Sequence, residues 1–251
     1  MIELPAETLK FFLVFLRVLS VLFLIPLFSL RQVSFLFKVG FSLALSNLIY
    51  DRLDLELPSS PPFVSISGEV LLGLLVGFLV RVVFAALSMA GEIASLQSGF
   101  SFSRSIDPYS EAQTSLLVEL KYLLAMLLFF AIDGHHVILK SLYESFSLVP
   151  LGGFSLNEGV YELIVRITGS TFAMALKIGS PLVVSLFLIE VSLGILSRLV
   201  PQMNVFLEGI PVKILASISI LSLSLGLISP LLTGLFFSLE GNIASLFRGS
   251  G

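Results

Sequence analysis

Long apolar runs set the first limit on what this chain can fold into. Roughly six follow one another along the sequence, at residues 11–30, 35–50, 70–90, 116–132, 163–196 and 212–237. A helix needs about 20 apolar residues to cross the hydrocarbon core of a bilayer, and several of the runs reach that length. Charged residues make up only 12% of the chain, against about 25% in a soluble domain. The sequence therefore predicts an all-α integral membrane protein.

Composition also excludes several functional classes. The net charge is −3 and the pI is about 5.4, so the chain lacks the basic footprint of a protein that binds nucleic acid. Cysteine is absent, which rules out disulfides, thiolate metal sites and a cysteine nucleophile. The segment before the first run is acidic, and no small-residue cleavage site follows that run. We expect it to be a retained helix rather than a signal peptide.

Polar segments and prolines divide the runs. Three segments rich in polar residues, glycine or proline read as loops: 51–67, 97–113 and 151–158. The run at 163–196 is too long for one span and contains Pro181, so it is either one kinked helix or two helices that meet near residues 179–181. Other prolines stand in or beside the runs at Pro26, Pro201, Pro211 and Pro230. We expect about half of these prolines to lie at helix ends and the others to bend helices that are covered by protein or water.

Charged side chains inside the runs are costly. A charge at the centre of a membrane helix costs roughly 2.5–3.5 kcal/mol on the insertion scale, so an apolar run tolerates one charge with little to spare. Four charged residues lie deep in their runs and are candidates for ion pairs between helices: Arg17, Arg81, Arg166 and Glu190. Three lysines lie nearer the ends, where we expect the ammonium group to reach the membrane surface: Lys38, Lys121 and Lys213. Gly73 and Gly77 have the GxxxG spacing that permits close helix approach, although this spacing often arises by chance.

No catalytic constellation is visible. The only histidines are His135 and His136, and neighbouring residues of a helix point about 100° apart, which makes the pair poor as two ligands of one metal ion. Metalloprotease, serine-hydrolase and phosphate-loop motifs are missing from the sequence. Asp107 and Asp133 have no surroundings that specify a carboxylate pair, and helix-end positions explain them better. We therefore expect no enzyme activity, no cofactor and no metal.

Three stretches, taken together, carry a family resemblance. The first is EIASLQSGFS at residues 92–101, followed by Ile106-Asp107-Pro108. The second is FFAIDGHH at residues 129–136, which leads to Ser145-Phe146 and Pro150-Leu151-Gly152. The third covers residues 194–213 and includes PQMNVF at residues 201–206. In this order and spacing, and with Arg17 and Pro26-Leu27-Phe28 before them, they resemble the FliR family of the flagellar type III export gate over nearly the whole chain.

The resemblance implies a fold, partners and a location. It implies kinked helical hairpins that assemble into a helical channel with FliP and FliQ subunits, FlhB wrapped around the channel and FlhA beneath it. Residues 1–155 would form a FliP-like portion, and residues 156–251 a FliQ-like helical hairpin. The location implied is the bacterial inner membrane, in the flagellar basal body, where the chain would meet membrane lipid and exported flagellar proteins.

The resemblance also implies a loop that closes the channel, at residues 99–108. Its candidate residues are Gly99, Phe100, Phe102, Arg104, Ile106, Asp107 and Pro108. Glycine and proline would set the shape of this plug loop, and phenylalanines could fill a narrow bore and block ions by dewetting. By composition alone, an ordinary turn between two spans is the favoured explanation, and it is the resemblance that favours a plug. Candidate polar residues for subunit interfaces or helix pairs are Arg17, Arg81, Asp133, His135, Arg166, Glu190, Arg198, Pro201, Gln202 and Asn204.

Two other functions stay open at this point. A secondary transporter for a small solute also uses buried charges and proline-broken helices, although its two halves usually have matching hydropathy, and no matching pair is found here. An export-gate subunit of a virulence type III secretion system would share the family resemblance. The general similarity favours the flagellar branch.

Overall fold

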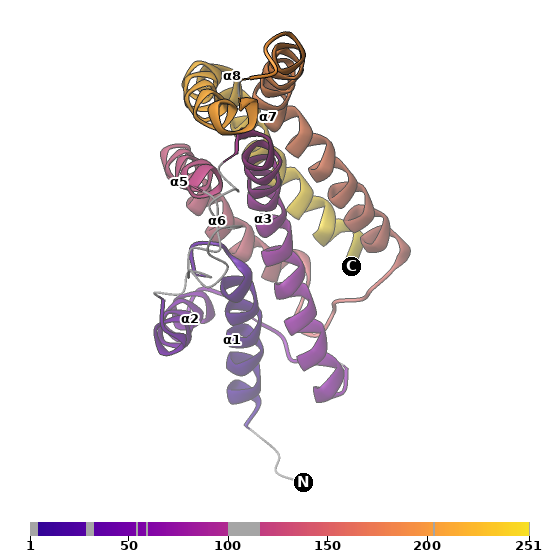
Figure 1. Cartoon of the computed structure of the whole chain (residues 1–251). Helices are drawn as coiled ribbons and strands as arrows, with labels where there is room; N and C mark the ends of the chain where they lie inside the picture. Colours follow the sequence, from indigo (N-terminus) through magenta and orange to yellow (C-terminus); the bar gives the residue numbers. More distant parts are fainter. Residues whose placement is uncertain are drawn as a thin grey trace. The chain divides into compact units, whose positions relative to one another are not determined.

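The computed structural model of the chain describes residues 5–28, 33–53, 55–58, 60–99, 116–202 and 204–250. Throughout this part the regular secondary structure is α-helix (Figure 1). The helices are α1 (Ala6–Leu24), α2 (Phe35–Tyr50), α3 (Pro62–Ser98), α5 (Leu116–Ala131), α6 (Gly134–Leu148), α7 (Glu158–Leu199) and α8 (Val205–Ser250). The predicted all-α class is confirmed.

Three described helices are long and apolar enough to cross a membrane: α3, α7 and the Gly226–Gly249 part of α8. The number rises to four if α5 and α6 together form one broken span. At 16 residues, α2 falls below the roughly 20 that a span requires. The apolar runs thus become helices, and three or four spans among the described residues meet these limits of length and composition.

Local sequence signals account for several helix ends. Ser34 precedes α2 and its hydroxyl accepts a hydrogen bond from the Phe37 N–H at 3.2 Å, which is a normal N-cap. Pro62 opens α3, at the position where the missing N–H of proline costs nothing. Gly99 follows α3 with φ of +86°, the left-handed conformation that glycine adopts where a helix stops.

The long run around Pro181 forms one helix. Pro181 lies inside α7, while Pro211 and Pro230 lie inside α8. Because Pro181 has no N–H, the carbonyl of Lys177 lacks its usual partner in the helix. The Ser180 hydroxyl donates to that carbonyl at 2.8 Å and replaces the lost bond. Pro26 and Pro201 lie at helix ends instead, whereas bending and cover of the helices at the other three prolines stay predictions.

The chain forms two compact units, and α3, α7 and α8 each contribute to both. Unit 1 comprises Met1–Val83, Asp133–Thr168 and Phe236–Gly251, and unit 2 comprises Phe84–Ile132 and Gly169–Leu235. The predicted division of the chain near residue 156 follows the family resemblance rather than compactness, and it stays a prediction.

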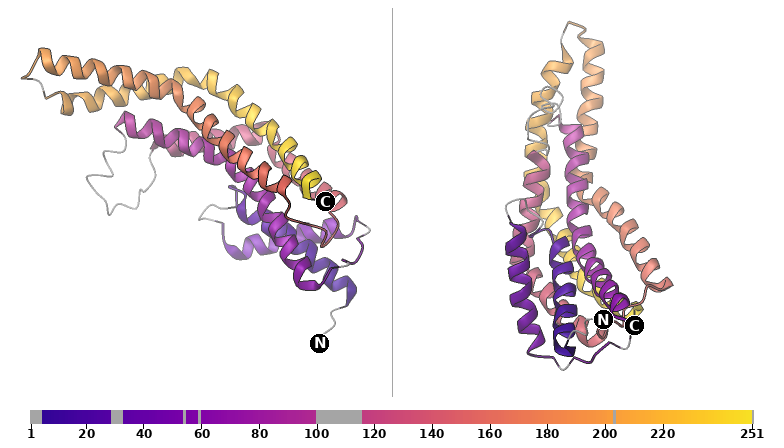
Figure 2. Two further views of the ribbon diagram at one scale, coloured as in Figure 1. Left: turned by 90° about the vertical axis from the view of Figure 1, so that its right-hand side faces the viewer. Right: turned by 90° about the horizontal axis from the view of Figure 1, so that it is seen from below.

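In unit 1, α1 and α2 lie side by side (Figure 2). The Tyr50 hydroxyl at the end of α2 donates to the Glu7 carboxylate at the start of α1, and this hydrogen bond lowers the pKa of Glu7. Both groups lie outside the candidate membrane spans. The contact fixes the ends of the two helices against each other.

Two glycines of α3 let α1 approach closely. A Cβ atom on Gly73 would lie 2.6 Å from the Arg17 carbonyl oxygen, and one on Gly77 would lie 2.9 Å from the Val21 carbonyl oxygen. Such distances exclude any side chain, so the GxxxG spacing is a helix-packing motif in this chain. The α1 side of the contact is apolar and fully buried at Leu13, Val14, Val18 and Val21.

In unit 2, α7 and α8 run side by side as a hairpin (Figure 2). Its buried core includes Ala94 of α3, Leu182 and Leu186 of α7 and Leu221 of α8. An apolar cavity of about 230 Å³ lies in this unit, lined in part by Leu87, Leu124, Ile178 and Leu232. Unit 2 is thus held by apolar packing among parts of α3, α5, α7 and α8.

Candidate functional site

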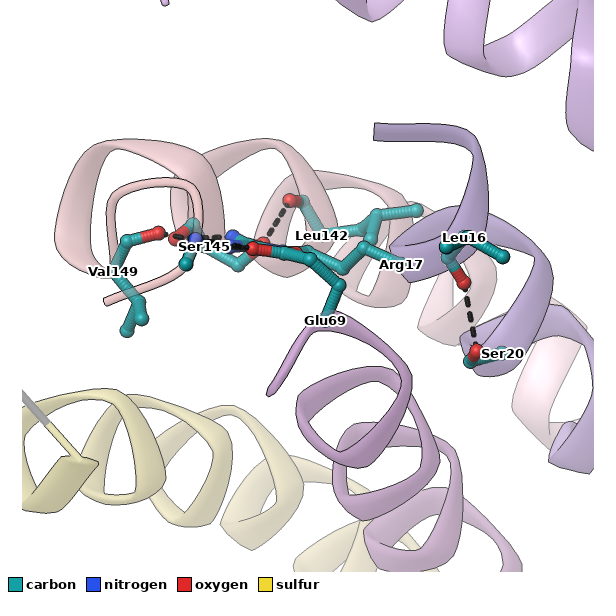
Figure 3. Close-up of polar contacts among 8 residues, drawn as sticks. Leu16, Arg17, Ser20, Glu69, Leu142, Ser145 and Val149 are labelled. Atoms are coloured by element: carbon teal, nitrogen blue, oxygen red, sulfur yellow. Dashed lines mark hydrogen bonds and ion pairs between the residues drawn. The ribbon is translucent and has the colours of Figure 1, made fainter. Parts of the chain in front are cut away.

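Arg17 is the most unusual residue of unit 1, because a charged side chain stands among the core residues of α1. It is 1% exposed. Its guanidinium group has five N–H donors, and the structure gives five hydrogen bonds to it. Two reach the Glu69 carboxylate, from Nε at 2.5 Å and from one terminal nitrogen at 3.0 Å. The other three reach the Ser145 carbonyl, the Ser145 hydroxyl and the Val149 carbonyl, at 2.9, 3.2 and 3.0 Å (Figure 3).

Glu69 of α3 is completely buried and supplies the opposite charge. Glu69, Gly73 and Gly77 follow one another at intervals of four residues, so they share one face of α3. The glycines bring the α1 backbone close enough for Arg17 to reach the carboxylate. A third donor completes the site, since the Gly152 N–H lies 2.8 Å from Glu69 Oε1. The pair is thus neutral and its charged atoms have partners.

The end of α6 forms the third side of this site. The carbonyls of Ser145 and Val149 lie in the last turn of α6 and at its C-cap, at the end of a helix that carries a partial negative charge. The Ser145 carbonyl already accepts from the Val149 N–H at 2.9 Å, and the guanidinium group donates to both carbonyls. The guanidinium group also lies 4.3 Å from the centre of the Phe146 ring, a cation–π contact.

Gly152 belongs to a tight turn that follows α6. The Gly153 N–H donates to the Pro150 carbonyl at 3.0 Å, and Gly152 has φ of +71°, as the third residue of a type II turn requires. A Cβ atom there would lie 2.7 Å from Ser65 Oγ and 2.8 Å from Pro58 Cβ. Only glycine fits both the backbone conformation and the space.

We call Arg17, Glu69, Ser145, Phe146, Val149 and Gly152 the Arg17 cluster. It joins α1, α3, α6 and the turn after α6, and its residues include Ser145-Phe146 and Gly152 of the second sequence stretch. Removing one partner of a buried ion pair typically costs about 3–5 kcal/mol, because the other charge is left without compensation. The cluster therefore fixes the relative positions of these segments. All five N–H groups of Arg17 donate to atoms of the cluster, so none is left to bind a solute.

A second ion pair lies in unit 2. Lys213 Nζ of α8 is 3.0 Å from Glu190 Oε1 of α7, and their side chains are 18% and 57% exposed. The Lys213 ammonium group thus has a partner across the hairpin, and its expected reach to the membrane surface stays a prediction. Sequence reasoning missed Glu69 and Lys213 as partners, because a pair between distant helices leaves no local pattern. The available signal was electrostatic: each deep charge required an opposite one, and Glu69 stands at the edge of an apolar run.

The second sequence stretch places Asp133, His135 and His136 together at the start of α6. Asp133 Oδ1 lies 3.2 Å from His136 Nδ1, and the centres of the two imidazole rings are 4.2 Å apart. The divergence expected of neighbouring residues is wrong here, because the side chains are long enough to turn toward each other. All three side chains offer a ligand atom within one small volume.

The remaining polar candidates are exposed. Arg81, Arg166 and Arg198 form no ion pair within the described part of the chain. Arg166 borders a pocket of about 420 Å³ together with Glu162 and Ser245. The connection between α7 and α8 carries the exposed Pro201, Gln202 and Asn204.

The predicted plug loop falls almost entirely outside the described residues. Gly99 is described, at the end of α3. Phe100, Phe102, Arg104, Ile106, Asp107 and Pro108 lie outside the described ranges. Their assignment as a plug stays a prediction.

Comparison with known proteins shows a family match over the part of the chain that contains the Arg17 cluster. The model of a family described as bacterial export proteins, family 1, matches residues 8–239, a range that contains the whole cluster. The chain belongs to this family. Among individual bacterial export proteins, it is 33% identical over 218 residues to the flagellar biosynthetic protein FliR of Bacillus subtilis (strain 168), covering 82% of each chain.

Two further bacterial export proteins match over an even larger share of the chain. The FliR protein of Escherichia coli (strain K12) is 30% identical over 234 residues, 92% of this chain and 90% of the relative. That of Pectobacterium carotovorum subsp. carotovorum is 29% identical over 243 residues, 94% of this chain and 92% of the relative. The relatives thus match at full-length scale rather than through one shared motif.

Proposed function

We propose that this chain is a subunit of the flagellar type III protein export gate, embedded in the bacterial inner membrane at the flagellar basal body. The observation that carries the proposal is the near full-length match to flagellar biosynthetic proteins, up to 94% of the chain. The candidate spans of α3, α7 and α8 agree with a membrane location. In this function the chain helps to form and to close a channel for flagellar components, and it has no catalytic step to perform.

The proposed partners are FliP, FliQ, FlhB and FlhA. Large apolar side chains on α7 and α8 support an assembly with other membrane proteins, and they include Phe187, Leu188, Leu215, Leu223 and Phe237, all more than half exposed. Exposed apolar groups of this size mark either lipid contact or subunit contact. We assign much of this surface to subunit contact, with lipid covering the rest.

The Arg17 cluster favours a gate subunit over a solute transporter. Transporters place charged groups near the membrane midplane so that they can bind a substrate. Every N–H donor of Arg17 is already used within the chain, and Glu69 accepts three hydrogen bonds. The Arg17–Glu69 pair therefore stabilises the packing of the helices and has no N–H donor of Arg17 left to bind a solute.

A deletion strain tests the main proposal. Loss of the gene should abolish flagella and export of flagellar components, and expression of the full chain from a plasmid should restore both. The matched control is a plasmid with an early stop codon. Normal flagella in the deletion strain would overturn the proposal, and loss of an injection-type secretion system alone would transfer the chain to the virulence branch.

Co-purification tests the partners separately. The tagged chain, extracted from membranes of the native host, should bring down FliP and FliQ in fixed ratios. A solute transporter would be recovered alone or as a homo-oligomer. Recovery without these subunits would contradict the assigned partners.

The plug loop has its own test. Shortening residues 99–107 should raise ion leakage through the assembled gate, because phenylalanines would no longer fill the bore. Insertion of the same number of glycine and serine residues at the exposed connection near Pro201 provides a control of equal size. Equal leakage in an assembled complex would show that the loop is an ordinary turn.

A further inference from the structure

The Asp133–His136 segment contains a group of side chains that are common metal ligands. The ligand atoms of Asp133, His135 and His136 all lie within 4.8 Å of one another. The Asp133 and His136 side chains are 72% and 68% exposed, so they can adjust, while His135 is half-buried. Two imidazoles and one carboxylate are a donor set that first-row transition metals favour.

The Asp133 carboxylate does not cap the helix that it precedes. Asp133 is the N-cap of α6, a position where aspartate usually accepts a hydrogen bond from a backbone N–H of the first turn. Its side chain makes no such bond. Instead, Oδ1 faces His136 Nδ1 at 3.2 Å, with the backbone in the left-handed region at φ of +57°. This conformation is uncommon for a residue with a side chain.

The separation of these two atoms suits a tetrahedral ion. Bonds of roughly 2.0–2.1 Å to zinc, at the tetrahedral angle, place neighbouring donor atoms about 3.3 Å apart. Asp133 Oδ1 and His136 Nδ1, now in a hydrogen bond of 3.2 Å, are close to that spacing. The ligand atoms of the group lie up to 4.8 Å apart, so a bound ion must draw them closer together. The exposed side chains of Asp133 and His136 have solvent around them in which to turn.

We propose that Asp133, His135 and His136 bind a divalent first-row transition metal ion, and that zinc is the ion bound. Magnesium and calcium are excluded as preferred ions because they take oxygen ligands, of which this group offers a single carboxylate. Three protein ligands leave one position of a tetrahedral ion open. Water, or a donor from a neighbouring subunit, completes the coordination.

The composition of the chain makes this proposal unusually simple to test. The chain has two histidines, both in this group, and no cysteine. Every imidazole ligand of the chain is thus in one place, and thiolate ligands are absent. The full chain should be purified in detergent with an affinity tag that contains no histidine, stripped with a chelator and titrated with zinc against a fluorescent zinc indicator.

Wild-type protein should bind one zinc ion per chain. His136→Ala, His135→Ala and Asp133→Asn should each weaken binding by at least about tenfold, as the loss of groups that support a metal site typically does. Glu144→Gln, an exposed carboxylate on the same helix, is the matched control and should bind as wild type does. Equal zinc affinity in wild type and in the double variant His135→Ala, His136→Ala would overturn the proposal.

A measurement on the unchanged protein covers the case of a variant that fails to fold. Zinc-edge X-ray absorption of the wild-type complex should show the scattering pattern of imidazole ligands. A shell of oxygen ligands alone would overturn the site. Neither measurement depends on export, so failure of the metal site leaves the proposed gate function unaffected.

Discussion

At the scale of single residues, Arg17 explains how a charge is stored inside a membrane protein. Burial of an ion is costly unless both an opposite charge and further hydrogen bonds are present. Glu69 provides the charge, and the end of α6 provides three acceptor contacts. Lysine could not replace this residue, because it has three donors from a single point in place of a planar group with five.

Removal of Arg17 should therefore be severe. Arg17→Ala should lower the free energy of unfolding by about 3–5 kcal/mol, because Glu69 is left as a buried unpaired charge. Arg17→Lys should lose less, since the charge persists. The double variant Arg17→Met, Glu69→Met should recover part of the loss. Titration of the detergent-solubilised protein with a denaturing detergent measures each value, and a double variant that loses the sum of both single losses would show that the charges do not interact.

Gly152 offers a test of the turn that the cluster depends on. Gly152→Ala should lower the free energy of unfolding by roughly 1–3 kcal/mol, since alanine is strained at positive φ and its Cβ would meet Ser65 and Pro58. Gly40→Ala on α2, where no atom lies within 4 Å of the added Cβ, is the matched control and should be neutral or stabilising. Thermal unfolding of the two purified variants decides between them, and an equal midpoint would contradict the strain argument.

Part of the Arg17 cluster could be predicted from the sequence. The depth of Arg17 in an apolar run predicted an inter-helix pair by cost alone, and the structure places it in one. Glu69 could not be singled out from the sequence, because it lies 52 residues away and other acidic residues along the chain were candidates too. The contacts with Ser145 and Val149 use backbone carbonyls, which no sequence pattern marks.

At the scale of helices, packing depends on the absence of side chains as much as on their presence. Gly73 and Gly77 have no side chain, and this lets the α1 backbone come so close to α3 that an added Cβ would lie within 3 Å of it. This close approach in turn allows the ion pair. The GxxxG spacing was a weak signal in the sequence, because chance produces it often; only the position of the partner helix gives it meaning.

Enlarging Gly73 should separate the two helices. Gly73→Leu would place atoms against the Arg17 carbonyl and Ser20 Cβ, both 2.6 Å from the new Cβ, and overpacking of a tight contact costs about 1–3 kcal/mol or more. We expect less protein in the membrane and weaker assembly, measured by blue native gels. Gly169→Leu, with open space around its Cβ, is the size-matched control. Normal assembly of the Gly73 variant would contradict the close packing.

The helix α7 makes a separate prediction about Pro181. Ser180→Ala should cost about 1 kcal/mol, because the Lys177 carbonyl loses the hydroxyl that replaces the missing backbone donor. In a Pro181→Ala background the same change should cost almost nothing, since the restored N–H satisfies that carbonyl. The double-mutant cycle, followed by detergent unfolding, tests this coupling. Equal costs in both backgrounds would rule out the compensation.

At the scale of the whole molecule, composition and apolar runs were enough to predict the class, and ordered motifs were enough to predict the family. The division into spans was harder, because membrane helices of this chain continue past the apolar runs. The run at 212–237 becomes part of a helix from Val205 to Ser250, for example. Hydropathy locates the apolar part of such a helix. It does not predict how far the helix continues into the polar residues on either side.

The exposed apolar surface of α8 gives a prediction about assembly. Leu223 is 83% exposed in the single chain. Leu223→Trp should reduce co-purification of partner subunits, because a packed protein contact resists a larger side chain whereas fluid lipid yields to it. The amount of the variant in the membrane, compared with wild type, serves as the control for insertion. Undiminished partner recovery would assign this position to lipid.

The Arg17 cluster also sets an order in time. Its charged partners are 52 residues apart, whereas the end of α6 follows Arg17 by 128 residues. At synthesis rates of about 5–20 residues per second, Arg17 and Glu69 are both made several seconds before Ser145 leaves the ribosome. In that interval Arg17 lacks its acceptors on α6 and Glu69 lacks the Gly152 N–H, so the hydrogen bonds of the cluster can be complete only after the turn that follows α6 has been made.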